Sequence, residues 1–157
     1  MPGELLYRII DEPKAGGLRE WAVRPFWPWL ALLLGGAWVG VPWFVFNAFA
    51  LGSFTRRREV ALAVTLPLAT IGTFVAAMSV GEALDLGRAA VAYLVLPVLL
   101  VKLLIAYVLF NWQSRAAQLH EHFGQPLRQG AAVAVVAFLL RGRVLEGLPD
   151  LLKVGLL

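Results

Sequence analysis

The chain has 157 residues, of which 60% are hydrophobic and only 15% charged, and its mean hydropathy is +0.75. These values lie outside the usage of soluble globular domains and exclude an ordinary water-soluble enzyme. The formal charge of +4 does not indicate nucleic-acid binding, because the basic residues flank apolar blocks, where membrane orientation explains them better.

Residues 1–24 form a polar arm that contains one short apolar patch at residues 5–10. The arm mixes four acids with four bases and has no apolar region before a small-residue cleavage site. A cleaved signal peptide is therefore not expected. We expect the arm to lie at the membrane surface.

The block from Pro25 to Ser53 contains no charge and is longer than the roughly 20 residues that cross a hydrocarbon core. Its glycines and prolines include Pro28, Gly35, Gly36, Gly40 and Pro42. One interpretation is a long kinked span; the other is a helical hairpin or re-entrant pair. Trp38 and Trp43 would lie deep in a single span, which favours the hairpin because tryptophan prefers the interface. The tryptophans expected to anchor the interface are Trp27, Trp29 and Trp112.

Two further apolar blocks, at residues 60–80 and 89–112, predict transmembrane helices. A short polar connection at residues 82–88 joins them, and a polar linker follows at residues 113–129. The predicted class is an all-α polytopic membrane protein, with residues 25–157 as a single membrane domain.

Lys and Arg counts in short loops predict the orientation. Arg56, Arg57 and Arg58 form the densest basic cluster, so the loop that holds them is expected on the cytoplasmic side, in contact with anionic lipid. The 82–88 connection then faces the opposite side, and the 113–129 linker returns to the cytoplasm. The bases of the N-terminal arm favour the cytoplasm too, whereas a single crossing at residues 25–53 would place the arm on the opposite side, so one of these two interpretations must yield.

The C-terminal segment, residues 131–157, also has two interpretations. Residues 131–140 are apolar but, at ten residues, too short to span alone. Four charged residues follow at helical spacing: Arg143, Glu146, Asp150 and Lys153. We expect an interfacial amphipathic helix, bent near Gly147 and Pro149. The alternative is one tilted span whose charges are buried against partners.

A short motif carries a resemblance to a known family. Trp29-x-Ala31-x-x-x-Gly35-x-x-Trp38, after an aromatic pair at residues 26–27, resembles the opening motif of a family of small bacterial inner-membrane proteins of unknown function. The resemblance covers about a fifth of the chain, and the basic-aromatic continuation is replaced here by Val-Pro-Trp-Phe at residues 41–44. It implies a location in the bacterial inner membrane and an architecture, but no activity.

Lys102 lies near the middle of the 89–112 block, and an intramembrane charge is by default a functional hypothesis. Asn111 lies roughly 13 Å further along the helix, beyond comfortable reach of the lysine side chain. Three roles stay open: a structural lysine bonded to helix carbonyls, a group on a transport pathway or against a cofactor, and a contact to an acid of another subunit. Candidate internal hydrogen-bond partners are Thr65, Thr70, Thr73 and Asn47.

Residues that carry chemistry are scarce. Cysteine is absent, and a nucleophile elbow, a Walker loop and a metal-binding helix motif are not found. His120 and His122 are two residues apart, so they face different sides of a helix and cannot chelate one metal; we expect both to be solvated in the linker. No catalytic, metal-binding or cofactor-binding residue is predicted, and the chain is not expected to be an enzyme.

Two functions fit these patterns. The first is an accessory or scaffold subunit of a larger membrane protein complex, in contact with lipid and with other membrane subunits but not with nucleic acid. Small size and Ala/Gly-rich segments that allow close helix packing favour it. The alternative is a small transporter or channel component with Lys102 lining the pathway.

Overall fold

The computed structural model describes residues 17–156, apart from the side chain of Arg88; the apolar patch expected at residues 5–10 lies outside this range. The described part is helical, with one isolated bridge between Val23 and Arg128, so the predicted all-α class is confirmed. In chain order the helices are η1 (Arg19–Trp21), α1 (Phe26–Leu34), α2 (Ala37–Ala50), α3 (Arg56–Ala83), α4 (Arg88–Tyr93), α5 (Val95–His122), α6 (Ala131–Glu146) and α7 (Asp150–Leu156).

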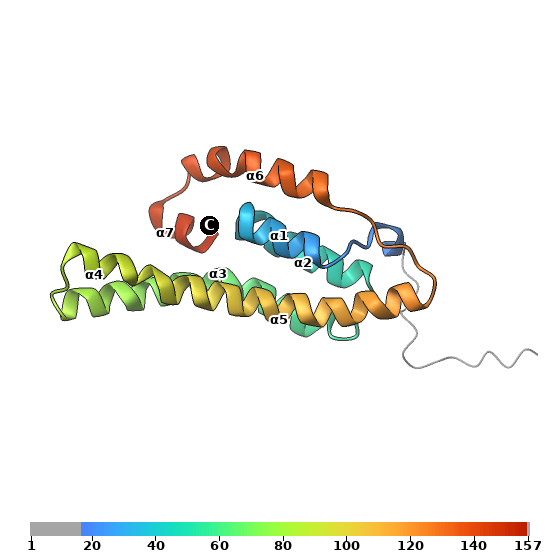
Figure 1. The fold of residues 1–157 in the computed structure, drawn as a ribbon, viewed down its shortest axis with the longest axis horizontal. Helices are drawn as coiled ribbons and strands as arrows, with labels where there is room; N and C mark the ends of the chain where they lie inside the picture. The colour runs from blue at the N-terminus through green and yellow to red at the C-terminus, as the bar shows by residue number, and fades with distance from the viewer. Residues whose placement is uncertain (1–16, 157) are drawn as a thin grey trace, which may run out of the picture.

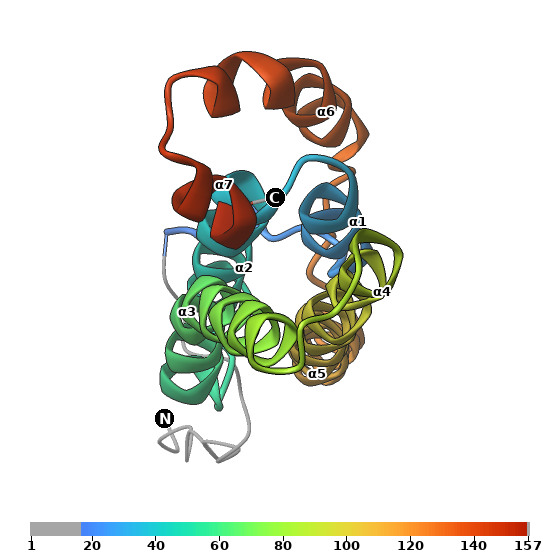
Figure 2. The same cartoon turned by 90° about the vertical axis from the view of Figure 1, so that its left-hand side faces the viewer.

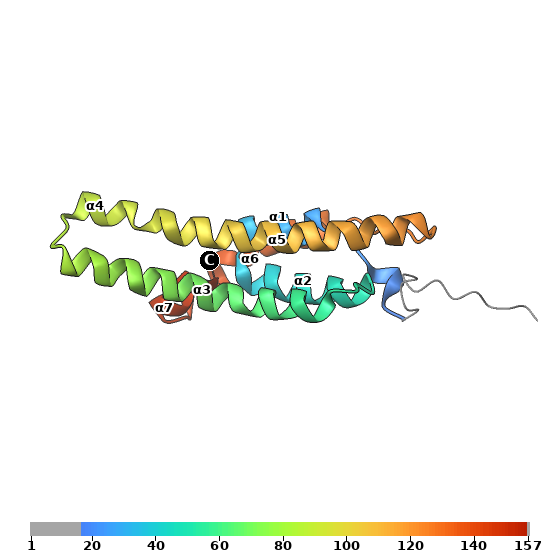
Figure 3. The same ribbon diagram turned by 90° about the horizontal axis from the view of Figure 1, so that it is seen from below.

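The longest elements form an antiparallel hairpin, in which α3 runs out and α4 and α5 run back beside it (Figures 1 and 3). Two helical stretches, Arg56–Ala83 and Ala89–His122, are long and apolar enough to cross a membrane. Only 22% and 17% of their most apolar windows are buried, which is not the pattern of core helices in a soluble protein. The two predicted spans are thus confirmed in length and composition.

α5 does not end with its apolar block. It continues to His122, so the first ten residues of the predicted 113–129 linker are helical, and the expectation of a linker there is wrong. The physical reason is local: residues 113–123 contain no glycine or proline, and Gly124 is the first helix-terminating residue after Trp112. Polarity alone does not stop a helix.

The segment from residue 25 to residue 53 folds as two packed helices, α1 and α2, joined at Gly35 and Gly36. Gly36 has φ 108°, a conformation that favours glycine, and the Trp38 Nε1 donates a hydrogen bond of 2.7 Å to the Gly35 carbonyl across the turn. At 1.5 Å per residue, α1 and α2 are about 14 and 21 Å long, against about 42 Å for α3. The α1–α2 hairpin therefore covers only part of the long hairpin (Figure 1).

A close approach holds the α1–α2 hairpin together at Gly40. A Cβ at Gly40 would lie 2.3 Å from the Leu32 Cβ and 2.5 Å from its Cα. The core surrounds this contact where α1, α2, α3 and α5 meet. Its buried residues are Leu32, Ala37, Phe44, Ala63, Leu66, Ala106 and Leu109.

Gly40→Ala is therefore expected to separate α1 from α2 and to lower the free energy of unfolding by about 2 kcal/mol or more. The matched control is Gly72→Ala in α3, where a Cβ would meet nothing within 4 Å. That control is expected to leave stability unchanged or raise it by about 1 kcal/mol, because alanine favours helices. Thermal unfolding in detergent measures both, and equal effects would contradict the close approach.

The C-terminal helices lie outside the others. Viewed end-on, α6 lies farthest from α3 and α5, with α1 and α7 between (Figure 2). Next to Gly35, the Ala137 side chain brings α6 against the end of α1, and Gly155 brings α7 against Ile71 and the Pro67 carbonyl of α3. Since residues 67 and 71 lie near the centre of the 60–80 block, α7 lies level with the middle of α3.

The chain breaks between α6 and α7 at residues 147–149, where a bend near Gly147 and Pro149 was expected. The preceding helix is longer than its apolar part, because α6 runs through Arg141 and Arg143 to Glu146.

Candidate functional site

Three buried polar residues from different helices meet inside the protein: Asn47 of α2, Glu59 of α3 and Gln113 of α5. Their exposed fractions are 0%, 1% and 0%. We call them the polar cluster. Of these three residues, only Asn47 was expected from the sequence to have a role, as a partner for Lys102; Glu59 and Gln113 were not predicted.

Gln113 is the centre of the polar cluster. Its Nε2 donates to the Phe44 carbonyl (2.7 Å) and to the Glu59 Oε2 (3.1 Å), and its Oε1 accepts from the Asn47 Nδ2 (3.0 Å). Both hydrogens of the Gln113 amide are thereby used. One side chain thus links α5 to the backbone of α2 and to the first turn of α3.

Asn47 extends the polar cluster to the segment before α1. Its Oδ1 accepts from the Val23 amide (2.9 Å), and its Nδ2 donates to the Val23 carbonyl (3.1 Å). This pair of bonds satisfies both backbone groups of a buried residue that no helix supplies with partners. The segment that leads into the α1–α2 hairpin is therefore fixed to α2.

Glu59 accepts hydrogen bonds on both carboxylate oxygens. Oε1 accepts from the hydroxyls of Ser53 and Thr55 (2.7 Å for Thr55), and Oε2 accepts from Gln113. Thr55 is the N-cap of α3, so the carboxylate lies in the first turn, where the helix dipole favours negative charge. The polar cluster is closed by internal hydrogen bonds and acts as a clamp between helices.

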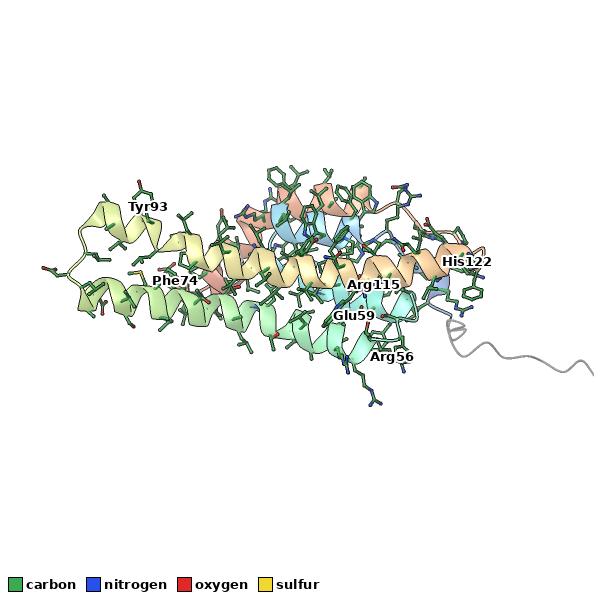
Figure 4. The ribbon with its side chains drawn as sticks, turned by 60° about the horizontal axis from the view of Figure 1, so that its bottom comes forward. Arg56, Glu59, Phe74, Tyr93, Arg115 and His122 are labelled. Carbon is green, nitrogen blue, oxygen red and sulfur yellow. The ribbon has the colours of Figure 1, made fainter. Side chains whose placement is uncertain are left out.

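The basic residues next to this clamp face outward. Arg56, Arg57 and Arg58 are all exposed, and Figure 4 shows Arg56 pointing away from the helices while Glu59 lies against them. The Arg56 guanidinium lies 5.9 Å from the centre of the Phe49 ring. Their contact with anionic lipid stays a prediction.

The tryptophans expected at an interface lie toward the same end. The Trp27 Nε1 donates to the Gln129 Oε1 (3.1 Å), and a Cβ at Gly130 would touch both Trp27 and Trp43. Trp29 packs against Phe110 at 5.9 Å between ring centres, and Trp112 is partly buried. Because the chain turns at Gly36, Trp43 returns to the level of Trp27.

Lys102 is 8% exposed and faces the interior from α5. Arg141 of α6 lies close enough to act on it electrostatically, and the Arg141 Nη1 donates to the Leu34 carbonyl at the end of α1 (3.2 Å). Arg141 thus lies at the carboxyl end of α1, where the helix dipole is negative. Asn47 does not belong to this site, since it contacts Gln113, about 16 Å further along α5. The threonines proposed as partners, Thr65, Thr70 and Thr73, donate to carbonyls of α3.

His120 is not solvated, which corrects the expectation for this residue, whereas His122 is exposed as expected. The side chain is fully buried, and within residues 17–156 neither ring nitrogen has a hydrogen-bond partner; Arg19 Nε is likewise buried and unpaired there. The cause is the extension of α5, which turns His120 inward while His122 faces out. Within the same range, no group of three or more His, Asp or Glu residues is placed to hold a metal ion.

Helical spacing provides the signal that could have found Gln113 and His120. The buried residues of α5 recur every three or four positions: Val98, Lys102, Ala106, Leu109, Gln113, Ala117 and His120. The apolar block ends within this stripe, but the stripe continues into the polar sequence. Glu59 begins the corresponding stripe of α3, followed by Ala63 and Leu66.

A cavity of about 210 Å³ lies at the far end of the long hairpin, away from both polar sites. It is lined by Met78, Gly81, Glu82, Asp85, Leu86 and Val91. Comparison of the chain with protein-family models, curated proteins and solved structures found no match.

Proposed function

We propose that this chain is an accessory or scaffold subunit of a larger protein complex in the bacterial inner membrane, with no catalytic chemistry of its own. The α3 and α5 helices cross the bilayer, and the α1–α2 hairpin re-enters from the cytoplasmic side. The polar cluster supports a structural role, because its hydrogen bonds are made between helices of the same chain.

One observation carries this proposal: exposed charges lie level with the middle of the apolar helices. Arg143, Glu146 and Asp150 are exposed, on a segment whose ends lie beside the central parts of α5 and α3. A charged side chain at the bilayer centre costs about 3 kcal/mol, so such residues normally face protein or water. A protein surface over α6 and α7 would remove that cost.

Mild-detergent purification followed by mass spectrometry of the recovered proteins tests the proposal. We expect specific membrane proteins to accompany the chain in constant proportion. A monodisperse preparation of this chain alone would contradict the accessory role.

A transporter component is the second candidate, because Lys102 is buried within the apolar part of α5 and Arg141 lies close enough to act on it electrostatically. Lys102→Met separates the two functions, with Leu104→Met on the exposed side of α5 as the control. Because Lys102 is 8% exposed and faces the interior of this chain, the accessory role predicts that the variant recovers companion proteins at wild-type level and leaves flux through the complex unchanged. A transport role instead predicts intact assembly with flux lost, in vesicles that contain the complex.

A further inference from the structure

The outer face of α6 is a continuous stripe opposite to the side that packs on the protein. Ala134, Ala137 and Leu145 are buried, and Ala137 contacts the end of α1 next to Gly35. Most of the rest of α6 is exposed, and five of its exposed residues lie opposite the buried side at steps of three or four positions. They are Ala132, Val136, Leu139, Arg143 and Glu146, which we call the α6 stripe.

The α6 stripe has the spacing of a helix–helix seam. Steps of four, three, four and three residues keep one face toward a neighbouring helix, as in left-handed helix pairs. Leu139 at its centre is 69% exposed, more than any other large apolar residue of α6. Figure 2 places α6 at the periphery, and no other helix of residues 17–156 lies on its outer side.

The α6 stripe carries one positive and one negative charge, so the charges of two such stripes can neutralise each other. Arg143 and Glu146 lie one turn apart, and within the described residues neither forms an ion pair. Asp150 and Lys153 of α7, by contrast, neutralise each other at 2.8 Å. One base, one acid and an otherwise apolar stripe have no net charge, so a second stripe of the same kind is a suitable partner.

We propose that the α6 stripe is the interface with a second copy of this chain. Both copies insert in the same direction, so the two-fold axis runs along the bilayer normal and the two α6 helices pack in parallel. Two arginines and two glutamates, Arg143 and Glu146 from each copy, then form one neutral cluster at mid-depth. Leu139 and Val136 pack across the axis, and Ala132 allows close approach at the cytoplasmic end. This inference rests on the proposed function in that both require protein over α6.

Cysteine cross-linking in native membranes tests the position of the interface, because the chain contains no cysteine of its own. Leu139→Cys is expected to give a cross-linked dimer upon oxidation. Leu100→Cys is the matched control, since Leu100 is 65% exposed on α5 but lies off the proposed interface. Equal dimer yields from the two variants, or capture of a different polypeptide by Leu139→Cys, would overturn the proposal. So would labelling of Leu139→Cys by a membrane-impermeant maleimide.

Charge reversal tests the pairing itself. In the Leu139→Cys background, Arg143→Glu places four acids at the axis and Glu146→Arg places four bases, so each variant alone is expected to cross-link at least about tenfold less. When the two variants are co-expressed with different tags, mixed dimers restore two acids and two bases. We expect the mixed dimer to form at near wild-type yield, although neither chain regains an opposite-charge pair within its own helix. Undiminished single variants, or failure of the mixture, would overturn the proposal.

The companion assay separates this outcome from that of the proposed function. Companion proteins recovered at wild-type levels with the charge-reversed variants would leave the accessory role intact while the dimer fails. A cross-linked dimer that purifies without any companion would support the interface and contradict the accessory role.

Discussion

Gln113→Leu is expected to lower the free energy of unfolding by about 3 to 5 kcal/mol, since it leaves the buried Glu59 carboxylate without its α5 partner. The same change removes the donor to the Phe44 carbonyl and the acceptor of the Asn47 amide. Leucine fills similar space, so loss of hydrogen bonds rather than a cavity is the cause. Thermal or denaturant unfolding in detergent measures the effect.

The matched control is Gln118→Leu, the same substitution five residues along α5 at an exposed position. It is expected to change stability by no more than about 0.5 kcal/mol. Equal stability of the two variants would show that the polar cluster does not clamp the helices.

Glu59→Gln offers a finer test because it preserves shape. The new amide can keep an oxygen toward Ser53 and Thr55, but its NH₂ group then faces the Gln113 NH₂ group, and two donors oppose each other. We expect a loss of about 1 to 3 kcal/mol, smaller than that of Gln113→Leu.

Much of the fold could be predicted from the sequence, because apolar block length is a strong signal when lipid is the expected solvent. The 60–80 and 89–112 blocks lie within long helices of matching composition. Four residues near the middle of the first segment, Gly35, Gly36, Gly40 and Pro42, suggested a turn, and the chain turns at the first two of them. The sequence did not decide whether residues 25–53 cross the membrane once or form a hairpin, because glycine and proline also occur within single membrane helices.

The polar cluster was harder to predict because its members occur in polar surroundings. Glu59 directly follows three exposed arginines, so it resembles one more solvated charge. Gln113 and His120 follow the apolar block, where composition changes but the helix does not end. Only the spacing of three and four residues between buried positions of α5 distinguishes Gln113 and His120 from solvated residues. Polar residues rarely suggest that a buried stripe continues through them. Tertiary contacts between segments 54 and 66 residues apart determine their burial.

The C-terminal segment shows a different limit of prediction from the sequence. Helical spacing places Arg143 and Glu146 on one exposed face, but the break at residues 147–149 puts Asp150 and Lys153 on the separate helix α7, so the four charges do not share one helix. The depth of that face cannot be predicted from spacing, because it depends on where α6 and α7 pack. Contacts of Ala137 with Gly35, and of Gly155 with Ile71, set that depth.

Membrane topology gives the second large effect: cysteines at the two ends of the long hairpin are expected to react from opposite sides of the membrane. Phe54, 96% exposed before α3, and Leu84, 65% exposed after it, are suitable positions. We expect Phe54→Cys to be labelled by an impermeant maleimide only from the cytoplasmic side, and Leu84→Cys only from the other. The basic cluster at residues 56–58 supports this direction.

Leu18→Cys decides whether the α1–α2 hairpin re-enters. Arg24 lies 3.6 Å from Glu121 near the end of α5, and the Arg128 Nε donates to the Glu20 carbonyl, so the segment before α1 lies at the same end as the linker after α5. If α1 and α2 turn back within the membrane, Leu18→Cys, at a position that is 45% exposed, reacts from the side that labels Phe54→Cys. Labelling from the Leu84 side would mean that residues 25–53 cross the bilayer once, and it would separate residues that the structure holds in contact. That result would also contradict the packing of Leu32 against Gly40, because this contact requires α1 and α2 to turn back on each other.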